Sequence, residues 1–292
     1  MRNLTQRTIV FFVGIAVLAV VTLVVPFANL LLLNAIAVVV SALGARELGR
    51  LFERRDTHFG AGAVVLPVLG GLLPLVQLLI LNGLLPDAAL LFTIYAVVSM
   101  TLLLQIFRRS VDAFADTLTN TAATITVFLY PGLFVSYFVR LSSFANPGPL
   151  VLLFLCTVFF NDTLAFLAGS LYRSLRSKLS GGRWSPTVLI PASPNKTIVG
   201  FVAGLAGAPV TILVAMRLFP TVFPGRPAHA LVFGAAIGAA TIAGDLIESA
   251  LKRSATSKDS GSIIPGRGGI LDSADSVLYA APVFYYLLAY VV

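Results

Sequence analysis

The chain has 292 residues, of which 58% are hydrophobic and 11% are charged, and its mean hydropathy is +0.96. A soluble domain carries about 25% charged residues on average, so this composition excludes an ordinary soluble protein and indicates an integral membrane protein. The net charge is +8, and the single cysteine, Cys156, excludes an intramolecular disulfide framework.

Apolar segments recur along the whole chain at the length of ~17 to 25 residues that a membrane helix needs. The sequence lacks the period-2 alternation of outer-membrane barrels, so we predict an all-α, polytopic helix bundle. About nine transmembrane helices are expected, near residues 8–26, 28–43, 61–80, 88–107, 118–139, 150–171, 198–219, 230–250 and 272–292. The first is long for a signal peptide, and we expect it to be retained.

The charged residues between these spans orient the chain, because cytoplasmic loops carry an excess of Lys and Arg. With the N-terminus in the cytoplasm, 17 of the 20 Lys and Arg residues fall on the cytoplasmic side, and only Arg140, Arg217 and Arg226 fall outside. We therefore expect a cytoplasmic N-terminus. Cations on this face attract the anionic headgroups of the lipid bilayer, so the net charge requires no nucleic-acid partner.

The predicted spans divide into about five in residues 1–145 and about four in residues 146–292. The N-terminal region holds one charged cluster at helical spacing, which we interpret as the solvated face of an interfacial helix. Its members are Arg46, Glu47, Arg50, Glu53 and Arg54. The C-terminal region has the longer cytoplasmic loops, and the candidate functional residues lie there.

Three carboxylates fall within predicted spans, where a charge at the bilayer centre costs about 2.5 to 3.5 kcal/mol and calls for a partner or a function. Asp162 follows Asn161 in the sixth span, and Asp245 and Glu248 lie toward the cytoplasmic end of the eighth. Each is therefore a candidate site residue.

The eighth span carries a polar stripe at its cytoplasmic end. Asp245, Glu248, Ser249 and Lys252 are spaced i, i+3, i+4 and i+7, so they share one helix face. One interpretation is an internal salt bridge from Asp245 or Glu248 to Lys252. The other is a site for a hard cation, because carboxylate and hydroxyl oxygens are ligands that Mg²⁺ prefers.

A glycine-rich segment follows this stripe and leads into the ninth span. Residues 265–269 read Pro-Gly-Arg-Gly-Gly, and Asp272 and Asp275 stand one helical turn apart just after them. Backbone N–H groups at such a helix start suit a phosphate. Nearby cations, namely Lys252, Arg253, Lys258 and Arg267, complete the components of a metal and polyphosphate site. A solvated basic loop explains the cations equally well, but it does not explain the aligned carboxylates.

A second polar loop precedes the seventh span. The stretch IPASPNKTIVG, residues 190–200, places Ser193, Asn195 and Lys196 before a helix start, where Lys196 could neutralise a phosphate. The alternative is that Lys196 serves only as a topology anchor at the membrane surface.

The order of these residues resembles the signature of phosphatidate cytidylyltransferases, also called CDP-diacylglycerol synthases. The signature begins at Ser249, continues through KR, KD and PGRGG, and ends at Asp275. Three upstream segments, NDTLAFLAG, SPNKTIVG and GDLIES, also resemble family segments, and they occur in the family's order. The likeness covers residues from about 150 to 292. It implies a membrane enzyme that transfers CMP from CTP to phosphatidic acid, which gives CDP-diacylglycerol and pyrophosphate.

The resemblance also implies roles for individual residues. The expected catalytic residues are Asp245, Asp272, Lys252, Lys258 and Asp259. The expected substrate-binding residues are Asn161, Asp162, Ser193, Lys196, Ser249, Arg253, Arg267, Gly268 and Gly269. The expected metal ligands are Asp245, Glu248, Asp272 and Asp275, with Mg²⁺ as the ion and a second cation as an open alternative. The family also suggests a homodimer and, in a bacterium, an inner-membrane location with the site facing the cytoplasm.

Two departures from the family pattern lie inside the signature. Arg267 stands where the family usually has histidine, and Ser273 stands where it has arginine. We expect Arg267 to supply the positive charge that is missing at position 273. The alternatives are a CTP-dependent kinase of a lipid alcohol such as a polyprenol or phytol, a transporter, and an inactive relative with a scaffolding role.

Overall fold

The structure is a computed structural model, and it describes residues 20, 22, 27–54, 62–107, 114–181, 188–220, 222–223, 226–264, 266 and 268–291. Within these residues the chain is helical, and its one β feature is an isolated bridge between Ile264 and Gly268. The all-α prediction is confirmed for this part of the chain. The first expected span, near residues 8–26, lies outside the described residues except at positions 20 and 22.

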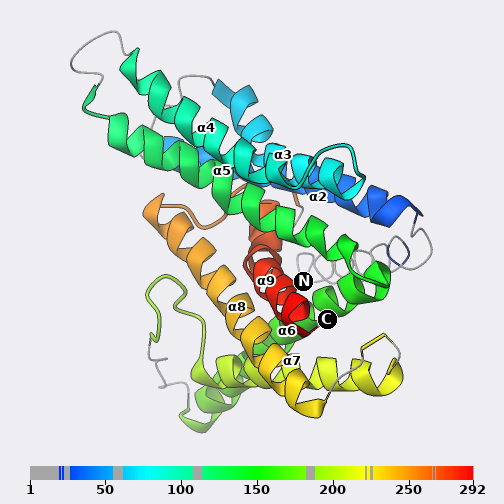
Figure 1. Cartoon of the computed structure of the whole chain (residues 1–292). Helices are drawn as coiled ribbons and strands as arrows, with labels where there is room; N and C mark the ends of the chain where they lie inside the picture. The colour runs from blue at the N-terminus through cyan, green and yellow to red at the C-terminus, as the bar shows by residue number, and fades with distance from the viewer. Residues whose placement is uncertain are drawn as a thin grey trace. The chain divides into compact units, whose positions relative to one another are not determined.

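The helices follow the apolar segments of the sequence (Figure 1). They are α2 (Phe27–Glu53), α3 (Gly62–Leu81), α4 (Ala88–Ile106), α5 (Thr117–Arg140), α6 (Pro147–Leu179), α7 (Ile198–Leu218), α8 (Pro227–Ser254) and α9 (Leu271–Val291), with a 3-10 helix, η2 (Leu141–Ser143), after α5. Among the described residues, six helices are long and apolar enough to cross a membrane: α2, α4, α5, α6, α7 and α8.

Three helices extend well beyond their predicted apolar cores at the ends that carry charge. The second expected span ended at residue 43, but α2 continues to Glu53; the sixth ended at 171, but α6 continues to Leu179; the eighth ended at 250, but α8 continues to Ser254. Arg, Lys, Glu and Leu are good helix formers, so the backbone remains helical after the apolar run stops. The basic residues of these three last turns, namely Arg50, Arg176, Lys178, Lys252 and Arg253, therefore lie on helix ends and not in loops.

The chain separates into two compact units, Met1–Gly148 with Ser254–Ala274, and Pro149–Arg253 with Asp275–Val292. The predicted division near residue 145 placed residues 254–274 with the C-terminal region. In the structure this segment packs with the N-terminal helices instead. The reason is a set of contacts from α2, described below with the candidate site.

In the first unit α2, α3 and α5 pack against one another, and α4 packs against α3 and α5, as Figure 1 shows. The approach of α2 and α3 depends on Gly70, where a Cβ atom would lie 2.1 Å from the Cβ of Ala45. Ser41 Oγ donates a hydrogen bond of 2.6 Å to the carbonyl of Gly70 at the same crossing. Small residues of this kind let membrane helices pack closely where the lipid supplies no hydrophobic driving force.

Glycines also set the helix crossings of the second unit. A Cβ at Gly200 of α7 would lie 2.7 Å from the carbonyl oxygen of Ala165 on α6, and a Cβ at Gly234 of α8 would lie 2.3 Å from Pro209 on α7. A Cβ at Gly244 of α8 would lie 2.6 Å from the carbonyl oxygen of Asp275 on α9. These close approaches bring the polar ends of α6, α7, α8 and α9 together.

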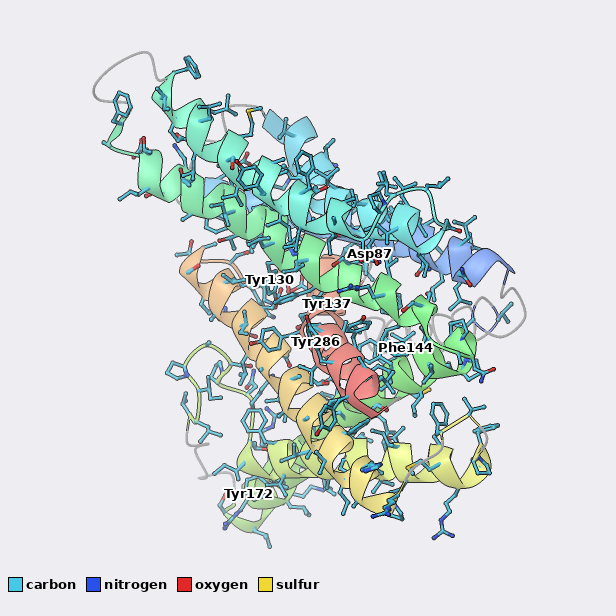
Figure 2. The ribbon with its side chains drawn as sticks, viewed as in Figure 1. Asp87, Tyr130, Tyr137, Phe144, Tyr172 and Tyr286 are labelled. Carbon is cyan, nitrogen blue, oxygen red and sulfur yellow. The ribbon has the colours of Figure 1, made fainter. Side chains whose placement is uncertain are left out.

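Arginine and tyrosine pair near the ends of two apolar helices. The Arg140 guanidinium lies 5.6 Å from the Tyr137 ring centroid at the end of α5, and Arg176 lies 5.6 Å from that of Tyr172 on α6. Figure 2 labels both tyrosines. Tyr and Arg are typical of membrane interfaces, so both pairs suit the ends of spanning helices.

Candidate functional site

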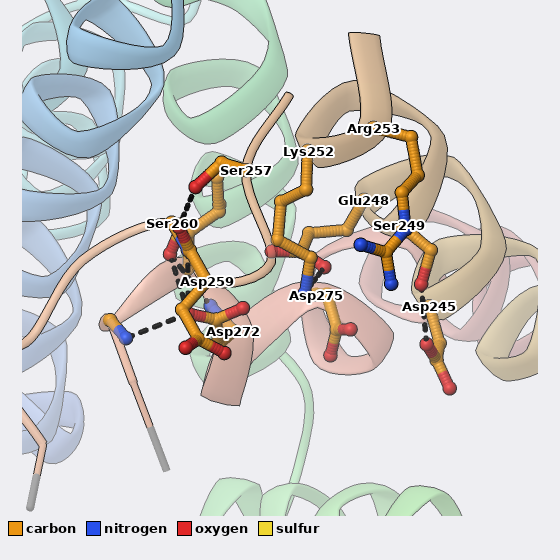
Figure 3. A network of polar contacts seen from close by, with 12 residues as sticks. Asp245, Glu248, Ser249, Lys252, Arg253, Ser257, Asp259, Ser260, Asp272 and Asp275 are labelled. Atoms are coloured by element: carbon orange, nitrogen blue, oxygen red, sulfur yellow. Dashed lines mark hydrogen bonds and ion pairs between the residues drawn. The ribbon is translucent and has the colours of Figure 1, made fainter. Parts of the chain in front are cut away.

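Polar residues singled out from the sequence lie in two clusters, one in each unit, together with residues that the sequence did not single out. We call Lys196, Asp245, Glu248, Ser249 and Lys252 the α8 cluster, and Glu47, Ser260, Gly269 and Asp272 the loop cluster. Figure 3 draws most of these side chains.

The α8 cluster is a row of ion pairs along one face of α8. Lys252 forms an ion pair with Glu248, and the Ser249 hydroxyl donates to Asp245 Oδ1 at 3.4 Å, both across one turn (Figure 3). Glu248 is fully buried, and Ser249 is 9% exposed. The shared face predicted for these four residues is confirmed, and the salt bridge considered for this stripe exists between Glu248 and Lys252.

The loop before α7 is tied to this cluster. Lys196 forms an ion pair with Asp245 of α8. Arg173 of α6 donates to the carbonyl of Asn195 at 2.7 Å, and Arg253 of α8 donates to that of Ala192 at 3.3 Å. The structure therefore brings the 190–197 loop and the α8 stripe together, as a common site requires.

Thr197 explains why α7 begins where it does. Its backbone is extended, with φ −122° and ψ 152°, and its hydroxyl accepts a hydrogen bond of 3.1 Å from the N–H of Gly200. This is an N-cap, which satisfies one of the unpaired amides of the first turn. The cap residue directly follows Lys196, so the helix starts two residues after that lysine.

Asn161 is fully buried in the second unit, and its expected role in substrate binding stays a prediction. A Cβ at Gly204 of α7 or at Gly238 of α8 would lie 3.2 or 3.1 Å from its Oδ1 atom, which shows how closely both helices enclose it. Its Nδ2 donates to Asp162 Oδ1 at 3.4 Å, and the hydroxyl of Ser276 also bonds to Asp162. Asn161 therefore orients Asp162.

Asp275 completes a group of three carboxylates in the second unit. Gly244 lets α9 approach α8 at Asp275, which places that residue beside the turn that holds Asp245. The negative charges of Asp162 and Asp245 both act on the buried carboxyl group of Asp275, while the Lys252 charge opposes them. The second unit thus concentrates negative charge against nearby lysines.

Asp272 organises the glycine-rich segment of the first unit. Its Oδ2 accepts from the N–H of Ser260 at 2.8 Å and from the N–H of Gly269 at 2.7 Å, and it lies 2.9 Å from Ser260 Oγ (Figure 3). Gly268 has φ +109°, and a Cβ there would lie 2.6 Å from Asp272 Oδ2. Only glycine suits that conformation and that approach.

The backbone N–H groups that the sequence suggested for phosphate are bound to the chain itself. The N–H of Gly268 donates to the carbonyl of Ile264 at 3.1 Å, and that of Gly269 donates to Asp272. Those of Ile270 and Leu271 donate to Glu47 at 3.0 and 2.9 Å. In this arrangement the start of α9 holds carboxylates, and this differs from the expectation that Gly268 and Gly269 present their amides to substrate.

Glu47 and Ser260 are the residues that sequence reasoning missed. We interpreted Glu47 as part of a solvated charge ladder, but its side chain is buried, with 1% exposed. Arg50, Glu53 and Arg54 of the same ladder are exposed, as expected. The available signal was spacing, because Glu47 shares a face with Gly44, Leu48 and Leu51, which are all buried.

The other predicted site residues have fewer contacts that inform a role. Lys258, Asp259 and Asn195 are exposed, Ser193 is half-buried, and Ser273 Oγ donates to the carbonyl of Gly269 at 3.4 Å. Arg267 lies outside the described residues, so its expected role remains a prediction.

The oxygen atoms of the predicted carboxylates are suitable metal donors. Within the part of the chain that the structure describes, no group of three or more His, Cys, Asp or Glu side chains could hold a metal ion. Asp245 and Glu248 are instead engaged by Lys196 and Lys252.

Several curated proteins are similar to this chain. The phosphatidate cytidylyltransferase of Bacillus subtilis is 34% identical over 164 residues, which are 55% of this chain and 55% of that protein. That of Helicobacter pylori strain 26695 is 36% identical over 162 residues, 54% of this chain and 53% of that protein. Phosphatidate cytidylyltransferase 5, chloroplastic, of Arabidopsis thaliana is 39% identical over 136 residues, 46% of this chain and 30% of that protein. The chain thus matches about half the length of these bacterial relatives and less of the plant protein.

The match to a protein family is more extensive than any of these pairwise similarities. The model of the cytidylyltransferase family covers residues 5–291, which is nearly the whole chain. The resemblance seen in the signature residues is confirmed at this level: the chain belongs to the cytidylyltransferase family.

Proposed function

We propose that this protein is a phosphatidate cytidylyltransferase, which transfers CMP from CTP to phosphatidic acid in phospholipid synthesis. The observation that carries the proposal is the family match over residues 5–291. The names of the relatives supply the substrate, because the matched bacterial and plant proteins are called phosphatidate cytidylyltransferases.

The reaction joins two phosphates. An oxygen of the lipid phosphate attacks the α-phosphorus of CTP and forms a new P–O bond. The bond from that phosphorus to the oxygen bridging to the β-phosphate breaks, and pyrophosphate leaves. Such transfers need in-line positioning and neutralisation of charge more than covalent help from the protein.

The α8 cluster suits this requirement. Lys196 and Lys252 are partly buried and held by carboxylates, while Arg253 at the end of α8 is exposed. A lysine ammonium group that is already paired with a carboxylate can pair with a phosphate instead. The exchange requires little further loss of water from the lysine. We therefore assign Lys196, Lys252 and Arg253 to the phosphates of CTP and of the lipid, with Lys258 and Arg267 as further cations from the glycine-rich segment.

The reaction also calls for a divalent cation, and the donor set fits one by its chemistry. The resemblance assigns Mg²⁺ to Asp245, Glu248, Asp272 and Asp275, all oxygen donors that this ion prefers. Support comes from the close approach of α9 to α8 at Gly244, which brings Asp275 beside the turn that holds Asp245. When bound, Mg²⁺ would neutralise charge on the reacting phosphates. A second cation at the same carboxylates is part of the proposal.

The membrane arrangement follows from the substrates and the charge pattern. We propose nine spans, a cytoplasmic N-terminus and a site that faces the cytoplasm, in the inner membrane if the source is a bacterium. The distribution of Lys and Arg supports this orientation. It would let CTP arrive from the cytosol while phosphatidic acid stays at the bilayer interface. On the family resemblance we also propose a homodimer, which crosslinking in membranes would test.

The decisive experiment uses purified protein in detergent with Mg²⁺, phosphatidic acid and CTP labelled on the α-phosphate. Label that appears in CDP-diacylglycerol supports the proposal. If the protein instead transfers a γ-label to a polyprenol or phytol, it is a lipid alcohol kinase. Asp245→Asn should abolish the CMP transfer, whereas Asp87→Asn, at an exposed position before α4, should not.

A further inference from the structure

Glu47 is a buried carboxylate in the N-terminal half of the chain, and the reaction described above does not use it. It lies in α2, one of the helices apolar enough to cross a membrane, and only 1% of the residue is exposed. A buried charge in such a helix is costly unless it is paired or hydrogen-bonded, so its presence calls for a specific partner.

The partners of Glu47 all come from the segment that carries the family signature. Its Oε1 accepts from the N–H of Ile270 at 3.0 Å, and its Oε2 accepts from the N–H of Leu271 at 2.9 Å. The Ser260 hydroxyl lies 3.0 Å from the same Oε2. Both carboxylate oxygens therefore bind the segment, at two points ten or more residues apart in the sequence.

Two glycines of the segment are shaped to this carboxylate. A Cβ atom at Gly261 would lie 2.3 Å from Glu47 Oε1, and a Cβ atom at Gly269 would lie 2.3 Å from Glu47 Oε2. Neither glycine has a positive φ, so the close approach of Glu47, and not the backbone conformation, excludes a side chain there. The Glu47 side chain of α2 therefore explains why positions 261 and 269 of this segment are glycine.

The same contacts set the position of Asp272. Ser260 lies between the two carboxylates, 3.0 Å from Glu47 Oε2 and 2.9 Å from Asp272 Oδ2, and its one proton can serve one of them at a time. Glu47 also holds Ile270 and Leu271, the two residues directly before Asp272. The positive end of the α9 dipole stabilises both carboxylates at this helix start.

We propose that Glu47 is a positioning residue for cytidylyl transfer: it holds the 260–271 segment so that Asp272 is presented in one orientation. This inference rests on the proposed function, in which Asp272 belongs to the catalytic set. It gives α2 a part in the reaction without contact between Glu47 and a substrate. Loss of residues that orient a metal-binding or catalytic group typically lowers activity by about 10- to 100-fold.

The first test replaces the carboxylate by an amide of the same shape. Glu47→Gln keeps one acceptor but turns an NH₂ group toward a backbone N–H, so one of the two helix-start contacts is lost. We expect kcat to fall by about 10- to 100-fold, with a much smaller change in the KM for CTP. The control is Glu53→Gln, the same substitution at an exposed position of α2.

A second readout does not depend on turnover. Hydrogen exchange followed by mass spectrometry reports the protection of the peptide that contains Ile270 and Leu271. This peptide should exchange faster in Glu47→Gln than in the parent protein or in Glu53→Gln, while peptides from α6 and α7 stay unchanged. Unchanged exchange in the 260–271 peptides would overturn the proposal.

A third test uses the fit of Gly261 to Glu47 and remains informative if Glu47 variants are less stable. Gly261→Ala alone should lower kcat, because its methyl group displaces the carboxylate. In a Glu47→Ala background the same change should add no further loss, since the clashing atoms are gone. The control is Gly44→Ala on α2, where the nearest heavy atoms would lie at 3.8 Å. Additive losses would overturn the proposal.

The outcomes separate this inference from the proposed function. If the parent protein makes no CDP-diacylglycerol, the proposed function falls, and hydrogen exchange still decides whether Glu47 holds the segment. If the parent is active and Glu47→Ala retains its kcat per folded molecule, the positioning role is wrong while the function stands. A loss of thermal stability with unchanged kcat also overturns the positioning role, since Glu47 would then be structural only.

Discussion

Lys196, in the loop before α7, forms an ion pair with Asp245 of α8. The two residues are 49 positions apart in the sequence, and the pair joins two segments that resemble separate motifs of one family. Each partner has a proposed role in catalysis, so the pair holds both groups in place before substrates arrive.

Replacement of Lys196 by methionine tests its role with phosphate. Lys196→Met keeps the length of the side chain but removes the charge, which leaves Asp245 without this partner. Hydrogen bonds to charged groups contribute about 1.5 to 3 kcal/mol, so kcat/KM for CTP should fall by about 10- to 100-fold. Lys178→Met, at an exposed position near the end of α6, is the matched control. Equal activity of the two variants would contradict the assignment.

Variants of the Glu248–Lys252 ion pair distinguish a structural role of this pair from a catalytic role. Lys252→Met leaves the fully buried Glu248 carboxylate without its ion pair, and breaking a buried pair costs about 3 to 5 kcal/mol of unfolding free energy. The double variant Glu248→Leu with Lys252→Met removes both charges and should recover most of that stability. Thermal unfolding in detergent measures this.

Activity of the same double variant tests whether the pair takes part in the reaction. The stable double variant should remain inactive in the labelled-CTP assay, because it lacks both Lys252, assigned to phosphate, and Glu248, assigned to Mg²⁺. A stable and active double variant would show that the pair is structural only, which is the salt-bridge interpretation of the α8 stripe.

Gly244 allows the close crossing of α8 and α9 that brings Asp275 beside the Asp245 turn. In Gly244→Ala the new methyl group would meet the Asp275 carbonyl oxygen at 2.6 Å, and backbone cannot move aside as a side chain can. Overpacking of this kind costs about 1 to 3 kcal/mol, and it should also lower turnover by moving Asp275. Gly71→Ala, where the nearest heavy atom would lie at 3.4 Å, should be tolerated.

Metal removal tests the carboxylate set as a whole. EDTA should abolish CMP transfer, and added Mg²⁺ should restore it, because two polyanionic substrates need a cation between their phosphates. Asp275→Asn should raise the Mg²⁺ concentration needed for half-maximal activity, and Asp87→Asn should not. Full activity in EDTA would remove the metal assignment.

Much of the architecture could be predicted from the sequence because it depends on local properties. Apolar runs of spanning length place the helices, and the described helices fall on the predicted segments. The i, i+4 spacing of the α8 stripe predicted a shared face, and the Lys252–Glu248 pair confirms it. Helix ends were less predictable, because hydropathy marks where apolar residues stop and not where the backbone ceases to be helical.

The role of Glu47 could not be predicted in the same way. It stands among Arg46, Arg50, Glu53 and Arg54, and composition alone makes that stretch look solvated. Burial depends on what packs against the helix, and here the partner is a segment more than 200 residues later in the chain. The spacing of Glu47 from Gly44, Leu48 and Leu51 indicates a buried face, but no local pattern identifies the segment that packs there.

Local residue order therefore predicted the helical class, the polar stripe and the family, since hydropathy, periodicity and motif order are properties of neighbouring residues. The tertiary structure decided which amides at the α9 start are bound, which glycines are sterically required and which charge of the α2 ladder is buried. These outcomes depend on contacts between distant segments, where one carboxylate from α2 accepts hydrogen bonds from the amides at the start of α9.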